Sequence, residues 1–147
     1  MSRASKRRSV PAAISVQLVD TNILAYLLIA GDRTSAAQEL YARDADWRSE
    51  AFIMVEFSNI LCRYVRSRAL TIEQGVELLT EAETLMPALP NVEHAHAMRI
   101  AMQFGLSAYD ARFVALAQNM KTRLVTEDKK LQAAVPAWTI SLASAIA

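Results

Sequence analysis

Four acidic residues lie inside or directly beside apolar segments of this chain. Asp20 closes an apolar run that reads as a buried strand, and Glu56 interrupts an apolar segment that reads as a helix. Asp110 and Asp128 hold comparable places in the second half of the chain. A carboxylate beside an apolar core carries a desolvation cost that an ion pair, a hydrogen bond or a bound cation must offset. A fold that gathers the four around one shared cation would offset several of these costs together.

The size and composition suit one globular domain. The chain has 147 residues, of which 53% are hydrophobic, and its three glycines and four prolines leave little room for long loops. Cys62 is the only cysteine, so no internal disulfide can form, which fits a reducing cytoplasm. Its apolar neighbours favour a buried thiol. Because no apolar run is long enough to span a bilayer and no secretory signal is evident, we expect a cytoplasmic protein that does not enter a membrane.

The net charge of +1 is unevenly distributed. Four of the sixteen basic residues fall within the first ten positions, and without them twelve basic residues face fifteen acidic ones, a net charge of −3. We therefore expect a flexible basic arm over residues 1–14 and a single domain over residues 15–147. The domain lacks the strongly basic balance of a dedicated nucleic-acid-binding module. The arm could bind RNA or an acidic surface, or it could simply be a disordered, solubilising terminus.

Strand-like and helical patterns alternate along the chain. Strands separated by helices imply right-handed βαβ crossovers, and hence a mainly parallel sheet with helices on both faces. The sequence therefore predicts an α/β fold. The expected strands are 14–19, 47–50, 123–126 and 138–142, and the expected helices are 23–28, 33–42, 52–68, 71–85, 93–104, 107–120 and 128–134.

Three of the four acidic residues have an alternative structural explanation, because each lies where a helix begins. Asp20 and Asp128 could serve only as helix caps. Asp110 could serve only as the third residue of a capping box that Ser107 opens. Taken singly, these residues do not establish a site.

Glu56 is internal to its predicted helix, so capping is excluded. Ile53 and Ile60 lie three residues before it and four residues after it, which turns this stripe of the helix toward the core. Arg63, seven residues on, offers an ion-pair partner as the alternative explanation.

The positions of the four acids in the predicted fold favour a shared site. Sites in open α/β sheets form outside the carboxyl ends of the strands. Asp20 and Asp128 directly follow strands, while Glu56 and Asp110 reach the same edge from the starts of helices. Oxygen ligands without histidine or cysteine suit Mg²⁺ or Mn²⁺ rather than zinc. Such a site can hydrolyse a phosphodiester, because one ion lowers the pKa of an attacking water and a second stabilises the leaving 3′ oxygen.

The same segments resemble the PIN-domain family, in order and over about residues 16 to 142. The resemblance is carried by 18–24, 55–61, 107–117 and 124–131. It implies a three-layer α/β/α fold and a metal-dependent endoribonuclease similar to the toxin of bacterial VapBC toxin–antitoxin pairs, which inhibits translation. It also implies Mg²⁺ or Mn²⁺ as cofactor, tRNA or ribosomal RNA as substrate, a cognate antitoxin and a homodimer.

The resemblance further assigns individual residues. The catalytic, metal-binding quartet would be Asp20, Glu56, Asp110 and Asp128. Asn22 and Thr126 would be supporting polar groups near the metal. Glu127 adjoins Asp128 and could substitute for it.

Binding of RNA needs positive charge near this acidic site, because the phosphate backbone dominates affinity. A solvated helix face is the alternative explanation for the same cations. Tyr26 and Tyr109 could stack on bases, or they could pack in the core or at the rim. The candidate cations are Arg63, Arg66, Arg112, Lys129 and Lys130.

Other functions that place an acid after the first strand fit less well. A phosphatase of the haloacid-dehalogenase type needs a second aspartate two residues after the first, where this chain has Asn22. A phospho-acceptor receiver domain needs paired acids at the end of the first strand. The stronger alternative is a non-catalytic PIN-like module that binds RNA or protein, and the presence of all four acids argues against it.

Overall fold

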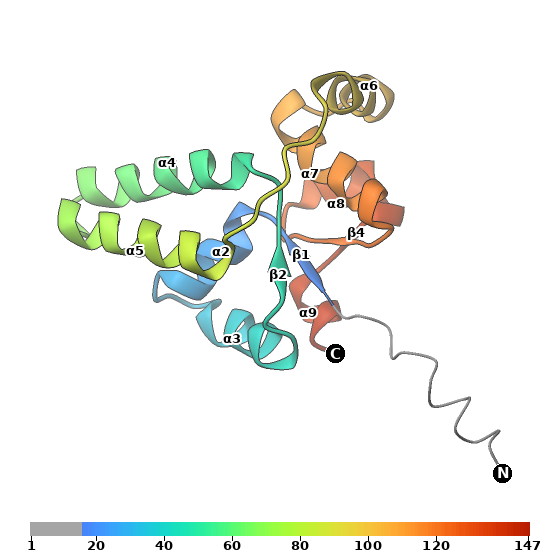
Figure 1. The fold of residues 1–147 in the computed structure, drawn as a ribbon. Helices are drawn as coiled ribbons and strands as arrows, with labels where there is room; N and C mark the ends of the chain where they lie inside the picture. The colour runs from blue at the N-terminus through green and yellow to red at the C-terminus, as the bar shows by residue number, and fades with distance from the viewer. Residues whose placement is uncertain (1–15) are drawn as a thin grey trace, which may run out of the picture.

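The computed structural model describes residues 16–147, which form a parallel sheet flanked by helices (Figure 1). The strand order is β2-β1-β3-β4, and every neighbouring pair is parallel. This arrangement confirms the expected α/β fold with a central parallel sheet. The expected basic arm, residues 1–14, lies outside the described residues. The strands are β1 (Gln17–Val19), β2 (Trp47–Arg48), β3 (Leu124–Val125) and β4 (Thr139–Ile140).

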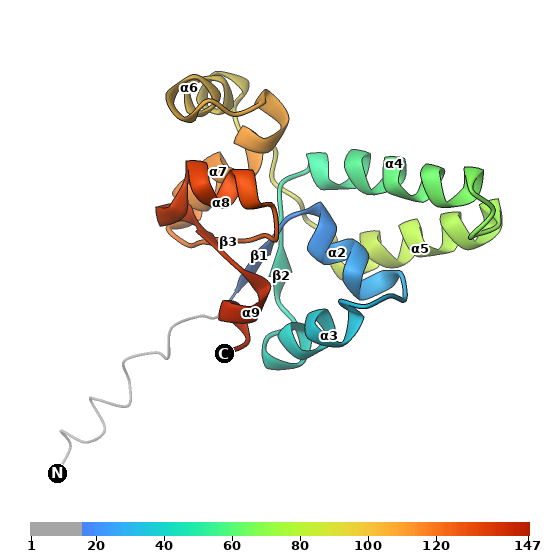
Figure 2. The same ribbon diagram turned by 180° about the vertical axis from the view of Figure 1, so that it is seen from behind.

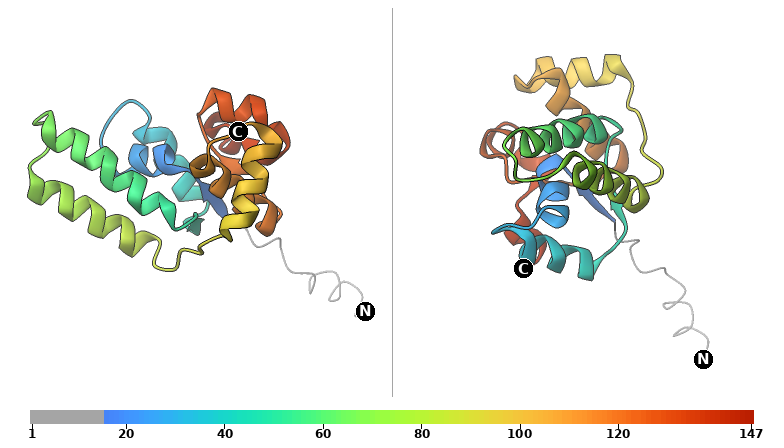
Figure 3. Two further views of the ribbon diagram at one scale, coloured as in Figure 1. Left: turned by 90° about the horizontal axis from the view of Figure 1, so that it is seen from above. Right: turned by 90° about the vertical axis from the view of Figure 1, so that its left-hand side faces the viewer.

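The helices cover both sides of this sheet. The long antiparallel pair of α4 and α5 lies on one side, and α7 and α8 lie on the other (Figures 1 and 2). The view from above shows the strands between these two groups (Figure 3). None of the helices in residues 16–147 combines the length and the apolarity that crossing a bilayer requires. The helices are α2 (Thr21–Leu28), α3 (Thr34–Arg43), α4 (Phe52–Arg66), α5 (Ile72–Leu85), α6 (His94–Phe104), α7 (Ala108–Met120), α8 (Lys129–Ala134) and α9 (Leu142–Ala145), with a short 3-10 turn at Pro136–Trp138.

Local capping chemistry explains why several helices begin and end where the sequence predicts. Thr71 and Gln74 form a reciprocal capping box at the start of α5. Gly105 ends α6 in the left-handed conformation, with φ of 67°, which a residue without Cβ adopts at little cost. Ser107 caps α7 by accepting a hydrogen bond from the backbone N–H of Asp110.

Two expectations are wrong in detail. The last strand ends at Ile140, because the Ser141 hydroxyl accepts from the backbone N–H of Ser144 and starts α9, which takes up Leu142. The Cys62 thiol is exposed. Its neighbour Leu61 takes the buried position, and one residue further along the helix turns the side chain by about 100°.

The core is built around α7, the most deeply buried helix. Six of its residues are buried, including Phe113, Val114 and Leu116. On the other side of the sheet, α2 contributes the fully buried Ile23 and Leu24. Both helices begin at the same edge of the sheet, so each delivers polar groups from its first turn to that edge.

A buried ion pair joins three segments near the start of α4. The Glu50 side chain is fully buried, and one of its oxygens lies 2.7 Å from Nη2 of Arg112 on α7. The same carboxylate accepts hydrogen bonds from the backbone N–H of Phe52 at 2.6 Å and of Val92 at 3.0 Å. Arg112 also contacts Asn91, so the loop before α6 is tied to both helices. The pair therefore fixes the start of α4 relative to α7.

Replacing Glu50 with alanine should be strongly destabilising. The Glu50→Ala variant leaves the Arg112 guanidinium, only 12% exposed, without its carboxylate, and it leaves two backbone N–H groups unpaired. Breaking one partner of a buried pair costs about 3–5 kcal/mol. Chemical denaturation measures this loss directly.

Arg48→Ala is the matched control, because Arg48 and Asp46 form an exposed pair at 2.6 Å. We expect the free energy of unfolding of Arg48→Ala to differ from that of wild type by less than about 1 kcal/mol. Equal losses in the two variants would contradict a special role for the buried pair.

Candidate active site

The four predicted acidic residues line one cleft of about 280 Å³. Asp20 comes from the end of β1 and Asp128 from the segment after β3, the strand next to it. Glu56 comes from α4 and Asp110 from the first turn of α7. The structure thus brings together residues that are up to 108 positions apart in the chain. The cleft is also lined by Thr21, Asn22, Asn59, Ile60, Arg63, Phe113 and Leu131.

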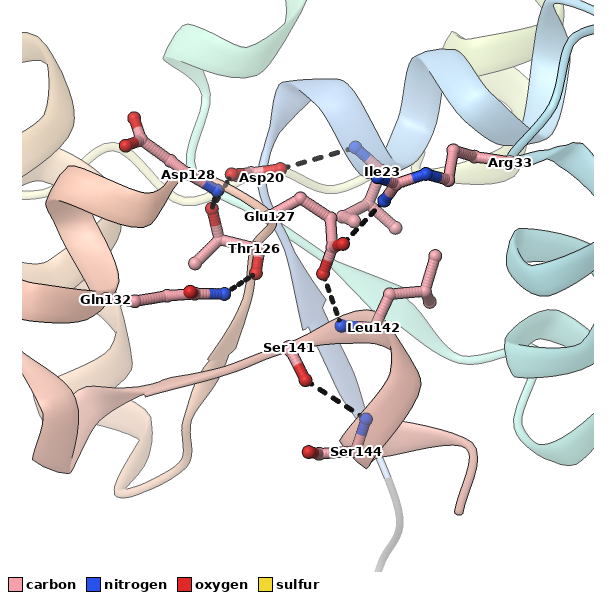
Figure 4. Close-up of polar contacts among 10 residues, drawn as sticks. All are labelled: Asp20, Ile23, Arg33, Thr126, Glu127, Asp128, Gln132, Ser141, Leu142 and Ser144. Carbon is pink, nitrogen blue, oxygen red and sulfur yellow. Dashed lines mark hydrogen bonds and ion pairs between the residues drawn. The ribbon is translucent and has the colours of Figure 1, made fainter.

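Asp20 combines a capping role with a place in the cleft. Its Oδ1 accepts a hydrogen bond from the backbone N–H of Ile23 at 3.3 Å, and its Oδ2 accepts one from the Thr126 hydroxyl (Figure 4). Only 9% of the residue is exposed. The pKa of Asp20 is raised to about 7, chiefly because burial disfavours the charged carboxylate. The hydrogen bonds from Thr126 and Ile23 lower this pKa, and the nearby charges of Glu56 and Asp128 raise it, but burial has the largest effect.

The Thr126 hydroxyl connects two of the four carboxylate positions. It donates to Asp20 and accepts from the backbone N–H of Asp128 at 3.1 Å. Thr126 is fully buried, so this arrangement is shielded from water. Asp128 in turn caps α8, with its Oδ1 accepting from the backbone N–H groups of Lys130 and Leu131 at 2.9 and 3.1 Å. The support role assigned to Thr126 therefore has a structural basis.

Glu56 and Asp110 occupy the side of the cleft formed by α4 and α7. The Thr21 hydroxyl donates to Oε1 of Glu56 at 2.5 Å. Burial raises the pKa of both carboxyls, and each is raised further by another acid of the cleft, Glu56 by Asp110 and Asp110 by Asp128. Ser107 accepts from the backbone N–H of Asp110, and a hydrogen bond from its side chain to the Asp110 carboxylate partly offsets the rise in pKa. Asp110 lines the cleft.

The donor set of the cleft suits a hard divalent cation. Among residues 16–147, no three acidic, histidine or cysteine side chains already converge in the arrangement of a metal site. The available ligands are nonetheless carboxylate, amide and hydroxyl oxygens, which Mg²⁺ and Mn²⁺ prefer. The carboxylates also raise one another's pKa, because they gather negative charge in one cleft. The residues therefore fit such an ion by their chemistry.

Glu127 points away from the cleft. Its Oε1 lies 2.5 Å from Nη1 of Arg33, and its Oε2 accepts from the backbone N–H of Leu142 at 2.8 Å (Figure 4). These contacts hold the pKa of Glu127 below its usual value. In this structure the fourth acidic position is therefore occupied by Asp128, and Glu127 anchors the start of α9.

Two cations lie close to the acidic cleft. Arg63 lines it directly, seven residues after Glu56 on α4. Lys130, on the first turn of α8, is near enough to Asp110 for its charge to lower the pKa of that carboxyl. These two side chains can attract a phosphate to a cleft whose floor is negative.

The other three candidate cations lie elsewhere. The Arg112 guanidinium is engaged by Glu50, Asn91 and the carbonyl of Val92 inside the protein. Arg66 borders an apolar hollow between α4 and α5. The charge of Lys129 helps to lower the pKa of Glu127, whose carboxylate points away from the cleft.

Sequence reasoning did not assign a role to Thr21 or Asn59, although both line the cleft. Thr21 follows Asp20 directly, and Asn59 lies one turn after Glu56 on the same face of α4. Their spacing from two predicted ligands was the signal that could have identified them. Asn22, which was predicted, also lines the cleft.

The raised pKa of Asp20 predicts a pH-dependent stability in the absence of metal. Folding favours the neutral carboxyl, so this contribution is complete below about pH 4 and is lost as the pH rises through about 7. In EDTA at pH 8, Asp20→Asn should therefore be more stable than wild type by at least about 1 kcal/mol, or roughly 2–4 °C in Tm. Thermal unfolding between pH 4 and 8 measures the difference.

Asp32→Asn is the control, since Asp32 is exposed in the α2–α3 connection. Asp32→Asn should not be more stable than wild type at pH 8, because an exposed carboxylate stays solvated in the folded protein. Parallel pH profiles for wild type and Asp20→Asn would contradict the burial of an ionisable carboxylate at this position.

Comparison with known proteins agrees with the fold. The family model described as PIN domain matches residues 18–136. Ribonuclease VapC3 of Pyrobaculum aerophilum is 25% identical over 124 residues, which cover 82% of this chain and 95% of the relative.

Two solved structures share the fold. The crystal structure of PAE2754 from Pyrobaculum aerophilum has a TM-score of 0.72 and 19% identity, covering 90% of this chain and 96% of that one. A toxin–antitoxin complex from Klebsiella pneumoniae gives a TM-score of 0.63 and 22% identity, covering 86% of this chain and 97% of that one. Together with the family match over residues 18–136, they show that this chain belongs to the PIN-domain family.

Proposed function

We propose that this PIN-domain protein is a metal-dependent endoribonuclease that acts as the toxin of a VapBC-type pair and inhibits translation. One observation carries the proposal. Four carboxylates from four separate segments line a single cleft at the carboxyl edge of a parallel sheet. This is the edge at which open α/β folds place their sites.

The relatives support the same activity. The protein from Pyrobaculum aerophilum that matches over 95% of its length is named a ribonuclease. The structure from Klebsiella pneumoniae is described as a toxin–antitoxin complex. We extend both descriptions to this chain as part of the proposal.

The quartet would hold one or two Mg²⁺ or Mn²⁺ ions. Such an ion lowers the pKa of a bound water and stabilises the charge that develops on a phosphodiester as it is cleaved. The protein's own contribution is to hold the carboxylates in place. The Thr126 hydroxyl orients Asp20, and the Thr21 hydroxyl orients Glu56. Neither threonine is itself acidic or basic, so their role is positioning.

The substrate we propose is RNA, with tRNA or ribosomal RNA as the expected class. Arg63 and Lys130 are the cations best placed to bind its phosphates, because both lie beside the carboxylates. RNA contacts of Arg66 and Lys129 stay predictions. The Arg112 guanidinium is already used by Glu50 within the fold, so we do not include it in the RNA-binding surface.

An antitoxin would also contact apolar surface on α4 and α5, outside the acidic cleft. A hollow of about 330 Å³ between α4 and α5 is lined mainly by apolar side chains, among them Leu61, Val65 and Leu79. Apolar grooves of this kind accept the nonpolar face of a partner helix. We propose this hollow as part of the antitoxin surface, a homodimer as the assembly, and the cytoplasm as the location of the reaction.

Replacing Asp110 with asparagine should abolish RNA cleavage without unfolding the protein. The Asp110 carboxylate forms no ion pair within residues 16–147, and an asparagine amide oxygen can still accept a hydrogen bond from Ser107, so Asp110→Asn removes a charge at little structural cost. With tRNA or ribosomal RNA and Mn²⁺, we expect the rate to fall at least about 100-fold, as for the loss of a group that stabilises transition-state charge. Glu83→Gln, an exposed acid on α5, is the matched control and should cleave normally. A folded Asp110→Asn variant that cleaves at the wild-type rate would refute the assignment.

Metal binding can be tested without measuring cleavage. Mn²⁺ at 100 times its dissociation constant should stabilise wild type by about 2.7 kcal/mol. The stabilisation should shrink in Asp110→Asn and be absent in EDTA, because the cation binds the folded cleft. Equal stabilisation of wild type and Asp110→Asn by Mn²⁺ would place the ion elsewhere. Stabilisation without cleavage of any RNA would favour the non-catalytic binding module.

A further inference from the structure

Tyr109 is an exposed aromatic residue held in a fixed position. The residue is 60% exposed, although it lies at the start of the most buried helix of the fold. Its ring stacks on that of Phe52, with the centroids 5.1 Å apart and the planes inclined by 10°. One face of the Tyr109 ring therefore packs against Phe52, and the exposed area belongs to the rest of the tyrosine.

Each member of the stacked pair lies within about one helical turn of an acid that lines the cleft. Tyr109 directly precedes Asp110 on α7. Phe52 lies four residues before Glu56 on α4, which puts the two side chains on one helix face about one turn, or 5.4 Å, apart. The pair thus spans the two helices that deliver Asp110 and Glu56 to the cleft.

We propose that Tyr109, supported by Phe52, is a stacking platform for an unpaired nucleobase next to the phosphate in the cleft. The inference rests on the proposed function, since it requires a phosphodiester beside the carboxylates. A nucleotide whose phosphate lies beside Asp110 carries its base within one nucleotide's length of that residue. An exposed aromatic ring at that distance offers the base a flat partner, and stacking of this kind is tolerant of base identity.

The platform restricts the shape of the substrate. Bases within an RNA duplex are already stacked on one another, so only a base that is unpaired and turned outward can lie on a surface tyrosine. The Tyr109 ring is also ordered before RNA binds, because its contact with Phe52 restricts its rotation. Little conformational freedom remains to be lost on binding. Cleavage should therefore occur in loops and single strands.

A protein partner is the competing occupant of this surface. Val55, one turn after Phe52 on α4, is 59% exposed and extends the apolar area. The position of Tyr109 directly before Asp110 favours RNA, because a nucleotide whose phosphate binds beside Asp110 brings its base close to the ring. Whether a second copy of the chain covers the stacked pair is an outcome of the experiment below.

The test measures RNA binding in the Asp110→Asn background, so that no cleavage occurs. Fluorescence anisotropy gives the Kd of a short single-stranded RNA and of the same sequence paired in a duplex, both with Mg²⁺. Adding Tyr109→Ala should weaken binding of the single strand by about 5- to 150-fold and leave duplex binding unchanged. Adding Tyr109→Phe should preserve the affinity, because the aromatic face remains.

Tyr41→Ala is the matched control. Tyr41 is 36% exposed and packs edge-on against Trp47, with the centroids 5.6 Å apart, on α3 away from the cleft. Removing its ring should not change the Kd of the single strand. Circular dichroism and Tm identify any variant that has lost its fold.

The outcomes distinguish failure of the stacking platform from failure of the proposed nuclease activity. If wild type cleaves RNA but Tyr109→Ala leaves both the Kd and the KM unchanged, the platform is overturned and the nuclease stands. If Tyr109→Ala loses single-strand affinity while wild type cleaves nothing, the platform stands and the nuclease fails. Absence of single-strand binding, equal losses for duplex and single strand, or a dimer that becomes monomeric with unchanged RNA affinity would each overturn the platform.

Discussion

The fold depends on how the carboxylate of Asp20 is accommodated at the end of β1. The group is 9% exposed, and its pKa is raised to about 7. Two hydrogen bonds reduce the cost, one from the first turn of α2 and one from Thr126 after β3. These bonds join the central strand, its neighbour and a helix at one point. The remaining unfavourable charge is what makes this edge of the sheet suited to a cation.

A second constraint keeps the two helical carboxylates in register with Asp20. The ion pair of Glu50 and Arg112 fixes the start of α4 against α7. Glu56 lies about one turn into α4, and Asp110 lies two residues before Arg112. Because the ion pair is buried, it holds these elements more firmly than a surface pair would. Two of the cleft carboxylates and a structural ion pair are thus held by the same two helices.

Features with a local signal were predictable from the sequence, while long-range pairings were not. The capping box at Thr71 and the turn at Gly105 each follow from residues within a few positions of one another. Each acid of the quartet was likewise marked by the residues directly beside it. The Glu50–Arg112 pair joins positions 62 residues apart, and the Arg33–Glu127 pair joins positions 94 apart. Neither pair appears in a local sequence pattern. Arg112 was therefore predicted to bind RNA, and Glu127 was kept as an alternative to Asp128.

The central claim is that Asp20, Glu56, Asp110 and Asp128 share one cation site. The most direct measurement is anomalous X-ray scattering from crystals of this protein soaked in Mn²⁺, because it locates the ion without depending on activity. The account predicts an anomalous peak within coordination distance of at least three of these carboxylates, about 2.0–2.3 Å. A well-occupied Mn²⁺ elsewhere, with the cleft empty, would contradict it.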